Sequence, residues 1–309
     1  MKPRILVLYY TQSGQLLDIL KNVVKDIAAQ ADITYAAIEP EQPFPFPWKK
    51  ASVFFDAMPE TVKRTPGPVK PLPQALFGQD FDLVIFGYQP WFLHPSQPIT
   101  AFLQSDNARI LKGKKVLTVI GCRNMWLHAQ ECVKQDLIKA GADLVGNIVL
   151  TDSYPNLIST LTVIRWAFSG QKERSRFLPP AGVQDREING ASRFGQPILD
   201  LLTGKTNGDF NAVLLSKGAV ELKPGLVLLE KRGMKNFRYW ANYISEKGGP
   251  GDPARVGRVL QFKNLLLVAI FILSPISNFT AFIQRQLQKK SLLRDVAYFK
   301  QTAYEAGRI

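Results

Sequence analysis

The sequence predicts an α/β fold: a five-stranded parallel sheet with helices on both faces, followed by a mainly helical C-terminal extension. Two observations predict it. Apolar runs alternate with longer helical patterns over residues 1–170, and there are five such runs, which is typical of strands buried between two helix layers. The expected strands are residues 5–9, 33–38, 83–86, 116–120 and 147–150.

Four helices are expected between and after these strands. Residues 125–140 place apolar side chains at helical spacing, and Pro155 precedes residues 156–168, where proline suits the start of a helix. The other two expected helices are residues 14–29 and a short one at 97–104.

The turn after the first strand has the composition of a phosphate site. Backbone N–H groups at a helix N-terminus are unpaired and positively polarised, Thr11 and Ser13 add hydroxyl donors, and Gly14 lets the chain approach an anion closely. No lysine follows Gly14, which excludes a nucleoside-triphosphate loop, and the spaced glycines of a dinucleotide site are missing. The turn therefore indicates a single terminal phosphate, although helix capping selects the same residue types.

Two further loops are expected at the same edge of the sheet. Ligands of open parallel sheets bind at the carboxyl ends of the strands, and the third and fourth strands end in residues 87–95 and 121–126. These loops offer glycine, amide and aromatic groups, so with the phosphate turn they fit flavin mononucleotide (FMN). The residues expected to bind it are Thr11, Gln12, Ser13, Gly14, Gln15, Leu16, Gln89, Pro90, Trp91, Phe92, Gly121, Cys122, Asn124 and Trp126.

Structural alternatives exist for several of these residues. Trp91 and Trp126 would also serve to cap the ends of the sheet, Arg123 would also pair with a surface carboxylate, and Gly87 and Gly121 would also serve as turn glycines. The coincidence of three such loops at one sheet edge favours the functional interpretation.

Histidine and cysteine are scarce. His94 and His128 are the two histidines, too few to build a metal site, and both lie in or beside the loops described above. The two cysteines, Cys122 and Cys132, form no disulfide framework or metal pattern, and the N-terminus has no signal-peptide character. A reducing cytoplasm is therefore the expected compartment.

Residues 39–80 form an unusually long, proline-rich connection, which excludes a long regular helix across much of it. Its aromatic residues favour an ordered cover over a flexible linker: Phe44, Phe46, Trp48, Phe54 and Phe55.

The positive charge is concentrated near the C-terminus. The chain has a formal charge of +14, and residues 201–309 hold 17 of the 39 basic residues but 7 of the 25 acidic ones. A charged run at 171–176 and a Pro-Pro pair at 179–180 place a boundary near residue 170, between a domain at 1–170 and a basic extension at 171–309. Such a charge favours nucleic acid or an anionic membrane, and the absence of basic-aromatic interleaving argues against nucleic acid.

Residues 264–283 contain no charged side chain and are long enough to cross a bilayer. Pro275 and several polar residues make the second half poorly lipophilic. Basic residues on both sides suit a hydrophobic element resting on an anionic surface at the inner face of the cytoplasmic membrane. Three interpretations stay open: peripheral membrane attachment, a buried helical hairpin or homodimer interface, and a true span.

The N-terminal part resembles the flavodoxin-like FMN proteins, whose phosphate loop has the form [ST]-x-[ST]-G-x-[ST]. Residues 11–16 match every position but the last, where Leu16 supplies no hydroxyl. The resemblance implies the flavodoxin-like version of the predicted fold, with one phosphate contact fewer than usual.

A closer resemblance covers most of the chain. Its motifs look like those of the DarA family, often labelled dialkylresorcinol condensing enzymes and better described as the aromatase partner of a ketosynthase-cyclase. The motifs are Tyr-Tyr-Thr-Gln-Ser-Gly-Gln-Leu at 9–16, Pro-Phe-Pro-Trp at 45–48, Gly-Tyr-Gln-Pro-Trp-Phe-Leu-His-Pro-Ser at 87–96, Gly-Cys-Arg-Asn-Met-Trp at 121–126 and Pro-Asn-Leu-Ile-Ser at 155–159.

This resemblance implies the oxidative aromatisation of a dialkyl-cyclohexanedione carrying a carboxylate to a dialkylresorcinol, with FMN as oxidant. A lipophilic substrate, a ketosynthase-cyclase and an acyl carrier protein would be its partners. Tyr88, His94 and His128 are the candidate proton-handling residues, and Arg123 is the candidate for holding a carboxylate or an enolate.

Two other functions remain open. An NAD(P)H-dependent FMN quinone reductase at the membrane surface would use the same cofactor site. An electron-transfer flavodoxin would too, but that class usually presents an acidic face, which the charge balance here argues against. A flavodoxin-like scaffold that binds no flavin is a further alternative.

Overall fold

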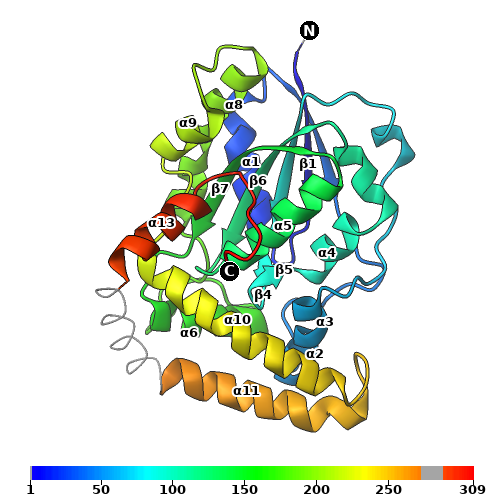
Figure 1. The fold of residues 1–309 in the computed structure, drawn as a ribbon, viewed down its shortest axis with the longest axis vertical. Coiled ribbons are helices and arrows are strands. Elements are labelled where there is room, and N and C mark those ends of the chain that lie inside the picture. The colour runs from blue at the N-terminus through cyan, green and yellow to red at the C-terminus, as the bar shows by residue number, and fades with distance from the viewer. Residues whose placement is uncertain (1, 273–287) are drawn as a thin grey trace.

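The computed structural model describes residues 2–272 and 288–309 (Figure 1). Part of the apolar segment 264–283, from residue 273 onward, therefore lies outside the described residues. No helix within the described ranges combines the length and the apolar character that crossing a bilayer requires.

A single five-stranded parallel sheet forms the centre of the molecule. Its strand order is β2-β1-β3-β6-β7, which is the doubly wound, flavodoxin-like order. This confirms the predicted fold class, and each expected strand lies within or one residue beyond an observed one. The strands are β1 (Arg4–Tyr9), β2 (Asp32–Ala37), β3 (Leu83–Tyr88), β6 (Lys115–Cys122) and β7 (Asp143–Thr151).

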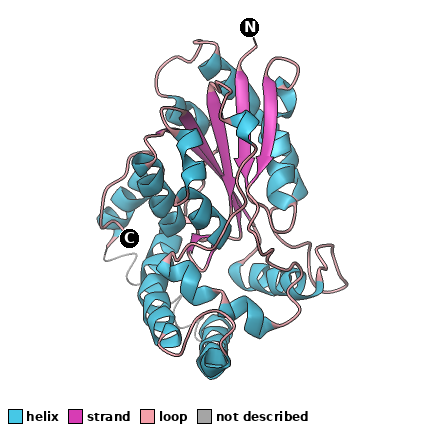
Figure 2. Cartoon of the chain, turned by 90° about the vertical axis from the view of Figure 1, so that its right-hand side faces the viewer, coloured by secondary structure: helices cyan, strands magenta, loops and turns pink. Residues whose placement is uncertain are grey.

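Helices cover both faces of the sheet (Figure 2). Successive residues of β3 show the two layers: Phe86 packs on Phe102 of α4, with ring centroids 5.8 Å apart, while Gly87 faces Leu20 of α1. The four expected helices are confirmed with small shifts at their ends, and the first ends in a 3₁₀ turn. They are α1 (Gln15–Val24) with η1 (Lys25–Ile27), α4 (Gln97–Leu103) with η3 (Asp106–Leu111), α5 (Leu127–Lys139) and α6 (Asn156–Ser169).

The connection at 39–80 contains two short helices, α2 (Ala51–Asp56) and α3 (Met58–Lys63), and a 3₁₀ turn, η2 (Gln74–Leu76). Its Trp48 is 3% exposed and Phe55 is 7% exposed. Aromatic side chains thus anchor this segment to the rest of the molecule.

The C-terminal part is helical in its described residues. Side chains between 183 and 228, among them Ile188, Phe194 and Leu214, join the same hydrophobic core as the sheet. The division of the chain near residue 170 stays a prediction. The elements are α7 (Asp185–Asn189), η4 (Gly190–Phe194), α8 (Gly195–Leu202), α9 (Phe210–Ser216), α10 (Pro224–Ser245), η5 (Pro253–Arg255), α11 (Val256–Phe271) and α13 (Lys289–Phe299).

Helices α2, α3, α10 and α11 pack together beyond the carboxyl ends of the strands, and we call them the cap (Figure 1). The cap has a small hydrophobic core of its own, made of Phe55, Met58, Val62, Ala241, Ile244, Val259 and Phe262. It joins two segments that are far apart in the sequence. The edge of the sheet where ligands bind in this fold therefore faces the cap.

A buried arginine fastens the two halves of the cap. The Arg255 side chain is fully buried, with its Nε 2.6 Å from Asp56 Oδ1 and its Nη1 2.7 Å from Glu60 Oε1. The remaining donors of the guanidinium reach backbone carbonyls of Asp56 and Gly248. The arginine thus links the N-terminus of α11 to helices α2 and α3.

Candidate functional site

The carboxyl ends of β1, β3 and β6 bring together the three predicted loops, residues 11–16, 87–95 and 121–126. In the observed strand order β1 and β3 are neighbours, yet their following helices, α1 and α4, lie on opposite faces of the sheet. This is the topological switch point, where a crevice opens between the two outgoing loops.

The first loop leads from β1 directly into α1, as the sequence predicted. Gly14 is left-handed, with φ 88°, and its N–H donates to Thr11 Oγ1 at 3.1 Å. A Cβ built on Gly14 would meet no atom within 4 Å, so the backbone angle and not crowding requires glycine here. The loop is half-buried, and the hydroxyl hydrogens of Thr11 and Ser13 remain available as donors beside the first turn of α1.

Three neighbouring side chains have structural partners. The amide of Gln15 exchanges two hydrogen bonds with the backbone of Val183, at 3.1 and 3.0 Å, and that of Gln12 donates to the carbonyl of Pro45 at 3.0 Å. Leu16 is 3% exposed and lies in the sheet core. These residues can therefore offer a ligand their backbone N–H groups, while their side chains hold other segments around the turn.

The second loop is a tight hairpin. Strand β4 (Pro90–Trp91) pairs with β5 (His94–Pro95), and the two residues between them, Phe92 and Leu93, have φ angles of 47° and 68°. Bulky residues rarely adopt this left-handed conformation, and each residue that does so costs on the order of 1–3 kcal/mol of stability. The strain places Trp91 and Phe92 at the edge of the sheet facing the 39–80 connection.

An aromatic cluster surrounds Trp91 beside the switch point. Trp91 lies 4.9 Å from Phe44, 6.0 Å from Tyr10 and 6.2 Å from Trp48, all between ring centroids and all in edge-to-face contact. Phe44 and Trp48 were not among the predicted site residues. The signal for them was the aromatic content of the 39–80 connection, but only the fold shows that they meet Trp91.

Two glycines serve helix packing: Gly121, which begins the third loop, and Gly87, which begins the second. A Cβ on Gly121 would lie 2.9 Å from Ile19 Cδ1, and a Cβ on Gly87 would lie 2.6 Å from Leu20 Cδ1. Both absent side chains let α1 lie directly on the sheet. The structure therefore gives Gly121 a packing role in addition to any role as backbone beside a ligand.

Arg123 and Asn124 bind the start of α6. Arg123 Nη1 donates to Asn156 Oδ1 at 2.6 Å and to Thr160 Oγ1 at 2.9 Å, and Asn124 Nδ2 donates to Asn156 Oδ1 at 2.9 Å. Among the residues that the structure describes, no carboxylate oxygen lies within 4.0 Å of the Arg123 guanidinium. Burial lowers its pKa. Arg123 is thus a half-buried cation whose charge is not cancelled by an ion pair.

His94 and His128 meet each other, with ring centroids 4.5 Å apart at 74°. The Nδ1–H of His94 donates to the carbonyl of Phe92 at 2.9 Å, so the Nε2 of a neutral His94 carries the lone pair. His128 Nε2 lies 3.4 Å from Cys132 Sγ. Burial lowers the pKa of His94 to about 4 and that of His128 to about 3, so both rings are neutral at pH 7.

Tyr88 lies in the core, not at the surface of the loops. Its side chain is fully buried, and its hydroxyl donates to Gln130 Oε1 at 2.6 Å. Gln130 continues the network to Thr118, which in turn donates to Asn147. Burial raises the Tyr88 pKa well above its usual value. The structure thus brings His94, His128 and Arg123 to the strand ends but holds the Tyr88 hydroxyl inside.

The remaining predicted residues of the second and third loops differ in how exposed they are. Cys122 is half-exposed, and burial of its thiol raises its pKa, while Trp126 is 1% exposed. Gln89 and Pro90 are half-buried at the start of the hairpin, where the carbonyl of Gln89 accepts the N–H of Ser96 at 3.2 Å.

A residue that the sequence did not predict completes this edge. Glu230 of α10 is fully buried, and its Oε1 accepts the backbone N–H of His128 at 2.7 Å. Burial raises the Glu230 pKa to about 7. No motif marks Glu230 in the sequence, because its position against α5 depends on how the cap docks.

Several buried polar atoms at this edge have no hydrogen-bond partner in the described structure. They include Asn124 Oδ1, His128 Nδ1, Glu230 Oε2 and Ser96 Oγ. Unpartnered buried groups are costly and are usually satisfied by a ligand or by water. Together with the phosphate turn and the aromatic cluster, they make this edge a fit for a molecule with a phosphate and a flat polar ring.

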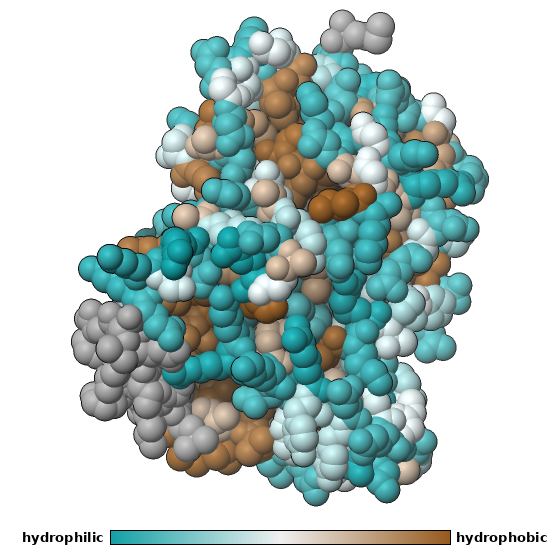
Figure 3. Space-filling view, in the orientation of Figure 1, coloured by the Kyte–Doolittle hydropathy of each residue, from teal (hydrophilic) through white to brown (hydrophobic). Residues whose placement is uncertain are grey.

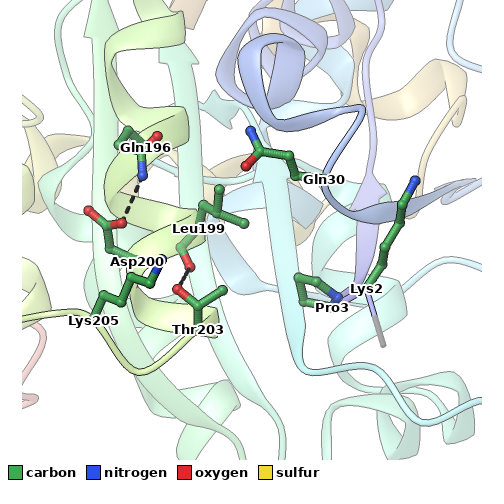
Figure 4. A pocket seen from close by; sticks show the side chains of 8 residues that line it. All are labelled: Lys2, Pro3, Gln30, Gln196, Leu199, Asp200, Thr203 and Lys205. Carbon is green, nitrogen blue, oxygen red and sulfur yellow. Dashed lines mark hydrogen bonds between the residues drawn. The ribbon is translucent and has the colours of Figure 1, made fainter.

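A shallow groove of about 530 Å³ lies at the opposite end of the sheet (Figure 4). It runs between Lys2 and Pro3, before β1, and the C-terminal half of α8. Its Gln196 and Thr203 are hydrogen-bonded to Asp200 and to the carbonyl of Leu199. The groove therefore lies away from the strand-end loops and offers no comparable set of unpartnered groups.

No protein-family model matches the chain, and no curated protein matches it. A protein described as a flavoprotein from Bacteroides eggerthii is 16% identical, with a TM-score of 0.37 over 52% of this chain and 96% of its own. A flavodoxin from the domain Archaea is 11% identical, with a TM-score of 0.34 over 65% and 99%. RosB bound to 8-demethyl-8-formylriboflavin-5′-phosphate is 11% identical, with a TM-score of 0.34 over 72% and 91%. Likenesses this distant say nothing about what this chain binds.

Proposed function

We propose that the chain is a flavoprotein that binds FMN at the carboxyl edge of its sheet. The observation that carries the proposal is the position of the phosphate turn and the hairpin loop on either side of the β1/β3 switch point. Doubly wound sheets of this strand order bind FMN at that crevice. Thr11, Ser13 and the first N–H groups of α1 would hold the phosphate, and Trp91 with its aromatic neighbours would contact the ring.

The proposed reaction is oxidative aromatisation of a dialkyl-cyclohexanedione to a dialkylresorcinol, as the sequence motifs imply. Oxidised flavin supplies an acceptor for the hydride that leaves the substrate ring. The side chains of this protein would then orient one ring against the other and bind the anionic group of the substrate. Arg123 suits that second role, because it is half-buried and has no carboxylate partner within 4.0 Å in the described residues.

His94 and His128 are better placed than Tyr88 to accept the proton. Both rings are neutral at pH 7, whereas the Tyr88 hydroxyl is committed to Gln130 in the core. Their low pKa values make them weak bases in the free protein. An anionic ligand nearby would raise both pKa values toward the range that proton transfer requires.

The cap offers a route for lipophilic substrates. Its helix α11 exposes a series of large apolar side chains, and Figure 3 shows an apolar surface over the C-terminal part of this helix. With exposed basic residues at the start of α13, this surface suits peripheral attachment to an anionic bilayer. The exposed apolar residues are Val256, Leu260, Leu265, Val268 and Ile272.

Anaerobic mixing of the flavin-loaded protein with candidate donors tests the proposed reaction. We expect a dialkyl-cyclohexanedione carboxylate to bleach the flavin absorption, with one resorcinol and one carbon dioxide released for each flavin reduced. Rapid bleaching by NADPH, with none by the cyclohexanedione, would instead identify a quinone reductase. An Arg123→Gln variant should bind FMN yet bleach at least tenfold more slowly, since a lost charge-assisted bond costs roughly 1.5–3 kcal/mol.

A further inference from the structure

Within residues 2–272 and 288–309, Glu230 is the buried carboxylate that the cap places against the strand-end loops. It comes from α10, more than a hundred residues beyond the loop that it contacts. Its Oε1 accepts the backbone N–H of His128 at 2.7 Å, and the N–H groups of Leu127 and Trp126 lie near enough to the carboxylate to lower its pKa. The side chain thus caps the N-terminus of α5, where the helix dipole favours a negative charge.

The other oxygen of Glu230 has no partner. Its Oε2 is buried without a hydrogen bond in the described structure, and so is Nδ1 of His128, the residue whose backbone the carboxylate holds. Among the described residues, no lysine or arginine nitrogen lies within 4.0 Å of Glu230. A side chain that only capped the N-terminus of α5 would not need to be a buried, unpaired carboxylate. An asparagine or serine directly before the helix would suffice.

The loop that Glu230 holds is also the loop that the proposed flavin would contact. Trp126 ends the 121–126 loop and His128 lies two residues further, in the first turn of α5, so the His128 N–H bond to Glu230 anchors the point where the loop enters the helix. We propose that Glu230 is a positioning residue of the flavin site, whose ionised carboxylate holds the 121–126 loop in the arrangement that receives the flavin ring. This inference rests on the proposed function.

Protonation of Glu230 would weaken this hold. An ionised carboxylate only accepts hydrogen bonds, whereas a carboxylic acid has less acceptor capacity and must place its own proton. The titratable groups that face Glu230 are Tyr88 from β3, Cys122 from β6 and His128 from α5. Burial keeps all three uncharged near neutral pH, so Glu230 is the member of this set that changes charge there.

Nuclear magnetic resonance of the flavin-free protein tests the hydrogen bonds without any reliance on flavin. We expect the amide resonances of Trp126, Leu127 and His128 to shift together between pH 5 and 9, with a midpoint near 7. The shift should vanish in Glu230→Gln, which keeps the shape of the side chain. Amides that do not titrate in this range, or that titrate equally in Glu230→Gln, would overturn the proposal.

A second measurement tests the link to the flavin. We expect the reduction potential of bound flavin in Glu230→Gln to be more positive than in the wild type at pH 8, because a nearby negative charge disfavours the reduced anion. Equal potentials would overturn the positioning role.

The matched control is Glu131→Gln. Glu131 is also buried on α5, but its carboxylate bonds Lys134 and Tyr298. This variant should leave both the amide titration and the potential unchanged. If the wild type binds no flavin, the proposed function fails while the amide titration still stands.

Discussion

At the scale of single residues, His94 and His128 make the stability of the fold sensitive to acid. Both pKa values are lowered by burial, so below pH 6.5 the unfolded chain takes up protons that the folded protein does not. Their contribution to stability is therefore lost as the pH falls from about 6.5 toward 4. Glu230 acts in the opposite direction, because its raised pKa makes the folded state less stable as the pH rises from about 4.5 to 7.

Replacement of one histidine isolates its contribution. The free energy of unfolding of the wild type should fall as the pH is lowered from 6.5 to 5. In His128→Gln this fall should be smaller by about 2 kcal/mol. Urea unfolding at both pH values measures it. Identical pH dependence in the two proteins would show that His128 is not buried in its neutral form.

Gly121 affects stability as a single residue, because its missing side chain leaves room for Ile19. Gly121→Ala should lower the free energy of unfolding by roughly 1–3 kcal/mol, since the new Cβ would lie 2.9 Å from Ile19 Cδ1. Gly78→Ala is the control, because no atom lies within 4 Å of its Cβ position. Equal stabilities in a urea titration would contradict the packing role.

At the scale of elements, the cap depends on a single buried guanidinium. Arg255→Met would leave Asp56 and Glu60 without their cation, and their side chains are only 22% and 13% exposed. We expect a loss of about 3 kcal/mol and faster proteolysis within α10 and α11. Lys70→Met removes a surface ion pair whose side chains are 55% and 58% exposed, so it should change stability by less than about 1 kcal/mol. Equal effects of the two variants would show that Arg255 does not fasten the cap.

The sequence predicted the elements of the sheet better than the contacts between distant elements. Strand β3 is apolar and fully buried, so its type follows from a pattern that local residues carry. The docking of α10 cannot be predicted from local residues in this way. Its helical pattern shows that one face is apolar but not which element that face contacts. For this reason Glu230 and the pairing of Trp48 with Trp91 could not be predicted, whereas the turn from β1 into α1 could.

At the scale of the whole molecule, two segments from opposite ends of the chain enclose one edge of the sheet. The 39–80 connection supplies Phe44 and Trp48, and the C-terminal part supplies Glu230, while the loops of the sheet supply the phosphate turn and the two histidines. Truncation before α10 would therefore remove part of the site as well as the two C-terminal helices of the cap. The membrane-facing role of residues 264–283 stays a prediction, because residues 273–283 lie outside the described residues.

The central claim is that the turn at residues 11–14 binds the phosphate of FMN, and a comparison of FMN with riboflavin tests it most directly. Titration by flavin fluorescence should give FMN an affinity roughly 100-fold above that of riboflavin, which lacks the phosphate. In the double variant Thr11→Val and Ser13→Ala this preference should fall to within about tenfold. Equal affinity of the wild type for the two flavins, or binding of neither, would contradict the account.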